Sequence, residues 1–147
     1  MEHRKFMSLA LSEAEKAAEK GEVPVGAVIV KDSKVISSSH NKTEERKSPL
    51  CHAEFMAAEE ALKVLGTKYL SDCTLYVTLE PCPMCMGALL HCKIGGVVFG
   101  AYDERTGSVT SKADLTEMEY FRKPKIIGGY MEEESKKLLK DFFEKRR

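Results

Sequence analysis

The chain has 147 residues with a hydrophobic content of 43%, which matches one ordinary domain with enough apolar surface for a core and excludes a disordered chain. Its 23 basic and 23 acidic residues give a formal net charge of zero. There is therefore no global electrostatic attraction toward nucleic acid, and a polyanionic partner would have to be held by a local patch.

No apolar run in the sequence is long enough to cross a membrane, the longest being Pro24 to Val30. The charged N-terminal segment MEHRKF is unlike a signal peptide, so we expect a cytoplasmic protein without a membrane partner. Five cysteines are an odd number, and a reducing compartment would keep them as thiols. Because no repeat or flexible linker divides the chain, residues 1–147 are expected to form a single domain.

The first half of the chain alternates helical and extended patterns. The predicted elements are, in order, a helix over 4–20, strands over 25–30 and 35–39, and a helix over 52–65. Gly21 and Gly66 end the two helices. A tight turn joins the two strands into a hairpin, and a polar loop over 40–51 leads into the second helix.

The second half continues with strands and shorter helices. The predicted elements are strands over 74–79, 97–99 and 126–127, a short helix over 82–92, and a final helix over 131–147. The final helix is expected to expose charges spaced at i,i+4. Its apolar side chains, which we expect to be buried, are Leu138, Leu139, Phe142 and Phe143.

This order of elements predicts the fold class. A hairpin followed by strand–helix–strand units favours an α/β fold in which helices cover both faces of a mixed sheet. Sheets of this kind place their sites at the carboxyl ends of strands, where helices begin. The segment EPCPMC, residues 80–85, stands at such a point.

Cys82 and Cys85 in that segment can be read in three ways. Side chains three apart on a first helical turn share a face, so both sulfur atoms can reach one metal ion. The same spacing after a strand also describes a thioredoxin-like redox pair, and a pair of buried, inert thiols is the third alternative. A helix N-terminus lowers a thiol pKa, which suits a metal ligand and a reactive thiolate equally.

The segment CHAEF, residues 51–55, decides between these readings. Taken alone, His52 is an ordinary residue at a helix start, and Glu54 suits the helix dipole in a first turn. Together with Pro81-Cys82-x-x-Cys85, however, they form the motif H-x-E…P-C-x-x-C, which is the signature of zinc-dependent nucleobase deaminases. We therefore interpret the cysteine pair as part of a metal site.

The chemistry explains these residue types. His52, Cys82 and Cys85 supply three zinc ligands and leave the fourth tetrahedral position to water. Zinc can lower the pKa of bound water to about 7. Glu54 is two residues from His52 and lies on another side of the helix, so we expect it to move protons rather than bind the metal.

The residues now described resemble the cytidine-deaminase-like superfamily and, more closely, the bacterial tRNA-specific adenosine deaminases that make inosine at the wobble position. The similar segments are EVPVGAVIV (22–30), HN (40–41), HAE (52–54), LYVTLEPCPMCMGALLHCKIGGVVFGA (75–101) and LLKDFFEKRR (138–147). Together they span nearly the whole chain.

The resemblance implies a three-layer α/β/α fold with a five-stranded mixed sheet, one zinc ion per chain and a homodimer. It implies that Glu54 is the proton shuttle and that His52, Cys82 and Cys85 are the ligands. It also implies that Asn41 contacts the flipped base. The tRNA anticodon loop would be held by the final helix, through Phe142, Phe143, Arg146 and Arg147.

Two other functions stay open at this point. One is deamination of a free base or nucleoside, of the guanine or cytosine type, because EPCPMC followed by Gly-Ala also resembles guanine deaminases. The other is a thiol redox or structural zinc module without deaminase activity, in which Glu54 would be dispensable. Phe142 also has an alternative to RNA contact, which is packing in the core.

Overall fold

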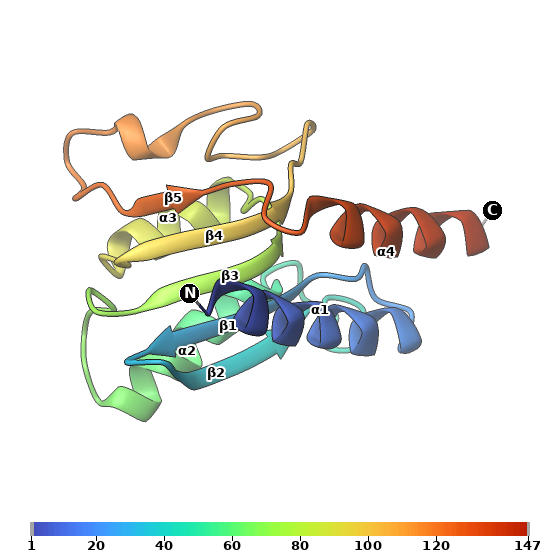
Figure 1. The fold of residues 1–147 in the computed structure, drawn as a ribbon, viewed down its shortest axis with the longest axis horizontal. Helices are drawn as coiled ribbons and strands as arrows, with labels where there is room; N and C mark the ends of the chain where they lie inside the picture. The colour runs from blue at the N-terminus through green and yellow to red at the C-terminus, as the bar shows by residue number, and fades with distance from the viewer. Residues whose placement is uncertain (1, 147) are drawn as a thin grey trace.

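The computed structural model describes residues 2–146 and has a five-stranded mixed sheet between two layers of helices (Figure 1). The predicted fold class is therefore confirmed. The elements in chain order are α1 (His3–Glu19), β1 (Gly26–Lys31), β2 (Lys34–His40), α2 (Ala53–Leu65), β3 (Thr74–Leu79), α3 (Pro83–His91), β4 (Gly96–Ala101), the short 3-10 turn η1 (Leu115–Glu117), β5 (Lys125–Ile127) and α4 (Glu132–Lys145).

The sheet has the strand order β2-β1-β3-β4-β5. β1 pairs antiparallel with both β2 and β3, whereas β3, β4 and β5 are parallel to one another. The predicted hairpin is thus β1–β2. The parallel β3 and β4 require crossover connections, and α3 supplies the one between them.

Each face of the sheet carries its own layer of helices. α1 and α4 pack on one face, and α2 and α3 cover the other. The alternation of side chains along β1 shows the division, because Ala27 and Ile29 join the core beneath α2 and α3, while Val28 and Val30 join the core beneath α1. Both faces of β1 are buried, which explains its continuous apolar sequence.

α1 lies close to the sheet, and Gly26 makes this approach possible. A Cβ atom at Gly26 would collide with the backbone of Ala10 and Ala14. Both alanines are fully buried and lie on the helical stripe that the sequence predicts. Small side chains on α1 and a missing side chain on β1 therefore bring the two backbones into contact.

The prediction for α4 is partly wrong. Ser135 is the buried residue that the structure records on this helix, Leu138, Leu139 and Phe142 are half-buried, and Phe143 is 51% exposed. The reason is the position of the helix: α4 packs against β4 and α1, and its C-terminal part extends past the ends of the strands (Figure 1). Of the residues assigned to RNA contact, Arg147 lies outside the described part of the chain.

The remaining boundaries differ from prediction by a few residues. β4 is longer than the predicted 97–99 and runs to Ala101, and the segment from 102 to 124 has η1 as its one recorded helical turn. Within residues 2–146, the helices lack the combination of length and apolar character that crossing a bilayer requires.

Candidate metal and catalytic site

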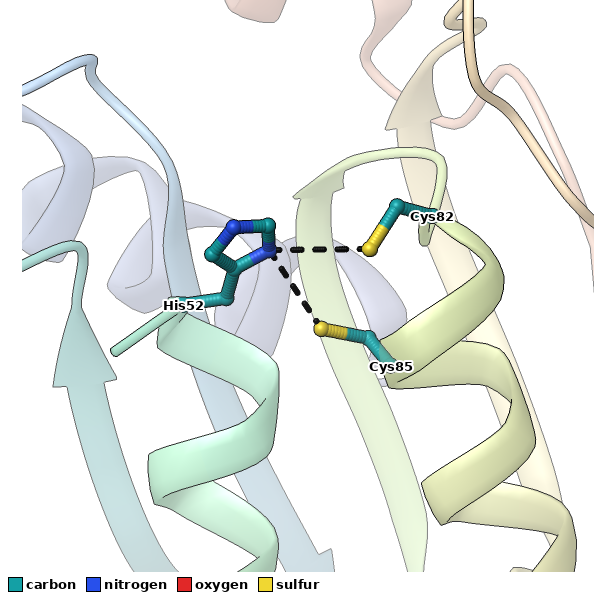
Figure 2. A group of neighbouring side chains, drawn as sticks. All are labelled: His52, Cys82 and Cys85. Carbon is teal, nitrogen blue, oxygen red and sulfur yellow. Dashed lines mark hydrogen bonds between the residues drawn. The ribbon is translucent and has the colours of Figure 1, made fainter. Parts of the chain in front are cut away.

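The ends of two helices bring His52 and the cysteine pair together. His52 is the N-cap of α2 and Cys82 is the N-cap of α3. Nδ1 of His52 lies 3.6 Å from Sγ of Cys82 and 3.5 Å from Sγ of Cys85. Figure 2 shows the imidazole pointing at both sulfur atoms from the neighbouring helix. The predicted grouping of the three residues is therefore present.

This arrangement fits a zinc ion. The three donor atoms all lie within 4.8 Å of one another. Tetrahedral coordination with ordinary zinc–nitrogen and zinc–sulfur bonds would separate a ligand nitrogen from a ligand sulfur by about 3.5 Å. The observed separations of 3.5 and 3.6 Å match that value. One imidazole and two thiols are also a soft donor set that zinc prefers.

The local electrostatics favour deprotonation of one thiol. Hydrogen bonding from Cys85, helped by His52 and opposed by burial, lowers the pKa of Cys82 to about 4. The pKa of Cys85 is raised because its thiol is the partner of Cys82 and is buried. The hydrogen bond to Cys82 raises the pKa of His52. These shifts favour a thiolate on Cys82 beside the imidazole of His52, a donor pair that suits a cation.

Proline and backbone geometry set the direction of α3. Pro83 occupies the first turn of the helix, where its missing N–H costs nothing. The backbone N–H of Met86 bonds the carbonyl oxygen of Cys82, so the first ligand begins the helix and the second lies one turn along it. The two sulfur atoms consequently face the same side, as the spacing predicts.

Glu54 lies in the first turn of α2 and is only 4% exposed. Burial raises its pKa to about 7, against the opposing effects of its own backbone amide, of His52 and of the Cys85 thiol. A carboxyl group with a pKa near neutrality can both accept and donate a proton at physiological pH. The position of Glu54 beside the cluster agrees with its predicted role as a proton shuttle, which stays a prediction.

Asn41 follows the last residue of β2 and is 9% exposed. Its Oδ1 accepts a hydrogen bond of 2.9 Å from the backbone N–H of Ala53, the first residue of α2. Since His52 makes no side-chain cap bond, Asn41 performs that task for the helix. Contact between its side-chain NH2 group and a base stays a prediction.

Phe143 lines a cleft of about 960 Å3 on the α4 side of the sheet. Leu79, the last residue of β3, lies in the same cleft together with Tyr102 and Arg105 from the segment after β4. The exposed ring of Phe143 is therefore at the carboxyl end of the strand that leads to the cysteines. Its contact with RNA stays a prediction.

Two acidic residues near the site received no role from the sequence. Glu22 and Glu80 are each 1% exposed, and their carboxylates bond loops on either side of the metal ligands. Burial raises the pKa of Glu80, but hydrogen bonds from Ser111, Thr110 and Asp103 lower it by more. The pKa therefore lies below its ordinary value. For Glu80, the available signal in the sequence is an acidic residue directly after a buried strand.

Comparison with known proteins places the chain among deaminases. The profile of the MafB19-like deaminase family matches residues 1–147. The chain is 47% identical to the tRNA-specific adenosine deaminase of Aquifex aeolicus (strain VF5) over 142 residues, which cover 97% of this chain and 94% of that protein.

Two solved structures show the same relationship. One comes from studies of A-to-I editing by tRNA:A34 deaminases at the wobble position of transfer RNA, and it superposes with a TM-score of 0.89 at 39% identity, covering 92% of this chain and 99% of the other. The guanine deaminase of Bacillus subtilis gives a TM-score of 0.66 at 39% identity, and that match covers 69% of this chain and 66% of the enzyme.

Proposed function

Because the chain belongs to the MafB19-like deaminases and, within the cytidine-deaminase-like superfamily, to the bacterial tRNA-specific adenosine deaminases, we propose that it converts adenosine to inosine at position 34 of tRNA. The observation that carries this proposal is the convergence of His52, Cys82 and Cys85 beside Glu54, in a chain that matches such enzymes over nearly its whole length.

One zinc ion per chain is part of the proposal. His52, Cys82 and Cys85 are the residues that would hold it, and their separations support this assignment. When bound in such a site, zinc makes water a nucleophile near neutral pH. The first turns of α2 and α3 point toward the same place, and their dipoles stabilise negatively charged ligands there.

Glu54 carries the proton transfers of the reaction. Water adds its oxygen to C6 of adenine, the bond between C6 and the exocyclic nitrogen breaks, and ammonia leaves. Glu54 accepts one proton from the attacking water and delivers it to the ring nitrogen N1. It then takes the proton of the new hydroxyl group on C6 and delivers it to the exocyclic nitrogen, which leaves as ammonia. Burial supports this role, because it raises the pKa of the Glu54 carboxyl and so favours its protonated form.

The substrate is the single-stranded anticodon loop of tRNA, in which a base leaves the stack at low cost. Asn41 contacts the flipped base through its side-chain NH2 group, while its Oδ1 stays bonded to Ala53. The exposed ring of Phe143 offers a surface on which a neighbouring base stacks. Arg146 lies over the ring of Phe142, 4.5 Å from its centre, and adds a positive charge beside these aromatic side chains.

We also propose a homodimer in the cytoplasm, formed by a single domain over residues 1–147. The outer side of α2 and α3 supports the dimer, because Phe55, Met56 and Met84 are only half-buried there. Apolar side chains next to a catalytic site favour a subunit contact at that place. Light scattering coupled to gel filtration measures the mass directly, and a monomer at micromolar concentration would exclude this part of the proposal.

A second candidate is deamination of free guanine, favoured by the structural similarity to the guanine deaminase of Bacillus subtilis. The assay that separates the two uses the purified, zinc-loaded protein with an anticodon stem-loop containing adenosine at position 34, with guanine and with cytidine. We expect inosine from the stem-loop and little ammonia from the small substrates. Turnover of guanine alone would assign the chain to the second candidate.

A further inference from the structure

Two buried carboxylates, Glu22 and Glu80, have no part in the chemistry just described. Each is 1% exposed. Glu22 lies four residues before the start of β1, and Glu80 directly follows β3. A buried carboxylate is costly unless hydrogen-bond donors surround it, so the donors that each one has gathered indicate what it holds in place.

Glu80 is surrounded by backbone N–H groups of one loop. Its Oε2 accepts hydrogen bonds from Val109, Thr110 and Ser111 at 3.1, 2.7 and 3.0 Å. Its Oε1 accepts one from the backbone of Asp103 at 3.1 Å and one from the Ser111 hydroxyl. The segment from 103 to 111 is therefore folded around a single side chain.

The packing around Glu80 is tight on the remaining side. A Cβ atom at Gly107 would collide with the carboxyl group of Glu80, so the loop passes directly over it. The backbone N–H of Ser108 also bonds the carbonyl oxygen of Pro81 at 2.9 Å. The loop is thus fastened to the segment that presents Cys82, and through Asp103 and Ser111 it lines the cleft that contains Phe143.

Glu22 binds the loop on the other side of the site. Its Oε1 accepts hydrogen bonds from the backbone of Glu44 at 3.0 Å and from the Thr43 hydroxyl at 3.3 Å, and its Oε2 accepts one from the backbone of Glu45 at 2.8 Å. This loop runs from Asn41 to the start of α2. Its residues and His52 line a depression of about 620 Å3.

We propose that Glu22 and Glu80 are positioning residues, each of which holds one of the two loops that form the walls of the substrate site. The proposal rests on the proposed function for the identity of the substrate. It predicts that each carboxylate holds its loop independently of the other, because the two carboxylates bond different loops and share none of the donors described above.

The substitutions Glu22→Gln and Glu80→Gln test this with little change in size. A carboxylate accepts hydrogen bonds through both oxygen atoms, whereas an amide turns one of them into an NH2 donor. In Glu80→Gln that donor would face backbone N–H groups whichever way the amide turns. Each variant should therefore release its own loop.

Hydrogen exchange followed by mass spectrometry reads out the loops separately. We expect Glu80→Gln to speed exchange in residues 103–111 and to leave 43–45 as in the parent protein, and we expect the reverse for Glu22→Gln. Each variant is the control for the other, and Glu15→Gln, an exposed site on α1, is the control for both. Faster exchange spread over the whole sheet in either variant would mean global destabilisation and would overturn the proposal.

Kinetics of zinc-loaded protein distinguish positioning from general structure. For the anticodon stem-loop we expect KM to rise by about ten-fold in each variant, with kcat within about two-fold of the parent and zinc content unchanged. An unchanged KM, or loss of zinc, would contradict the proposal that Glu22 and Glu80 position these loops. If the parent protein acts on guanine instead of the stem-loop, the proposed function fails. The same KM and exchange measurements, made with guanine, still test the positioning role of Glu22 and Glu80.

Ser111→Ala is the milder substitution to use if Glu80→Gln does not fold. It removes the hydroxyl donor to Glu80 and keeps the backbone donors. Faster exchange confined to 103–111, with a smaller rise in KM, would support the proposal. Exchange and KM equal to those of the parent protein would contradict it.

Discussion

The side-chain oxygen of Asn41 accepts a hydrogen bond of 2.9 Å from the backbone N–H of Ala53. The residue that follows β2 is thereby joined to the first turn of α2, the helix whose N-cap is His52. Asn41 thus has a structural bond through its oxygen and, in the proposed reaction, a substrate bond through its nitrogen. The two functions can be separated by substitution.

Asn41→Asp keeps an acceptor for Ala53 and removes the donor for the base. We expect its free energy of unfolding to stay within about 0.5 kcal/mol of the parent protein, while kcat/KM for the stem-loop falls by about ten-fold or more. Asn41→Ala removes both bonds and should lose about 1 kcal/mol of stability as well. Urea unfolding and initial rates measure the two effects, and an Asn41→Asp enzyme with parental kcat/KM would exclude the base contact.

Removal of metal should destabilise the protein. Since Sγ of Cys82 and Nδ1 of His52 lie 3.6 Å apart in a half-buried site, a cation bound between them stabilises the folded state. We expect one zinc per chain by metal analysis, a lower Tm after chelation, and recovery when zinc is returned. The Cys82→Ser variant should bind less than one zinc, and a chelated protein with unchanged Tm and activity would contradict the assignment.

Gly26→Ala should be among the more damaging single changes in the fold. The added Cβ atom meets the backbone of Ala10 and Ala14, which cannot move like a flexible side chain. We expect a loss of about 1–3 kcal/mol in the free energy of unfolding, measured with urea. Gly87→Ala is the matched control, because a Cβ there meets nothing within 4 Å, and equal effects at both positions would contradict the close packing of α1.

Phe143→Ala separates RNA contact from core packing. The ring is 51% exposed, so we expect the free energy of unfolding to change by less than about 0.5 kcal/mol. A lost base stack should nevertheless raise KM for the stem-loop by about ten-fold, because stacking on an aromatic ring contributes about 1–3 kcal/mol. Parental KM in this variant would show that the ring does not touch the substrate.

The sequence predicts the order of elements and the ligand set because both depend on local patterns. Helical and alternating spacing indicates the helices and strands, and the two short motifs at helix starts identify His52, Glu54, Cys82 and Cys85. The structure brings His52, Cys82 and Cys85 together because β2 and β3 are both antiparallel to β1, so they end at the same side of the sheet, where α2 and α3 begin.

The loops and the last helix could not be predicted in the same way. The hydrogen bonds of Glu22 and Glu80 reach over 21 to 31 residues along the chain, and residue spacing says nothing of such contacts. The apolar pattern of α4 predicts burial, yet exposure there depends on where the sheet ends, and the helix extends past it (Figure 1). An amphipathic pattern shows which side of a helix faces inward, and the tertiary structure decides how much of that side is buried by other elements.

The most direct test of the central claim is inosine formation by Glu54→Gln, measured on the adenosine-34 stem-loop together with zinc content. The substitution keeps the size of a side chain that is 4% exposed and removes its ability to exchange a proton. The account predicts one zinc per chain and a rate about a thousand-fold below that of the parent protein. A zinc-loaded Glu54→Gln enzyme with a rate near the parental value would contradict it.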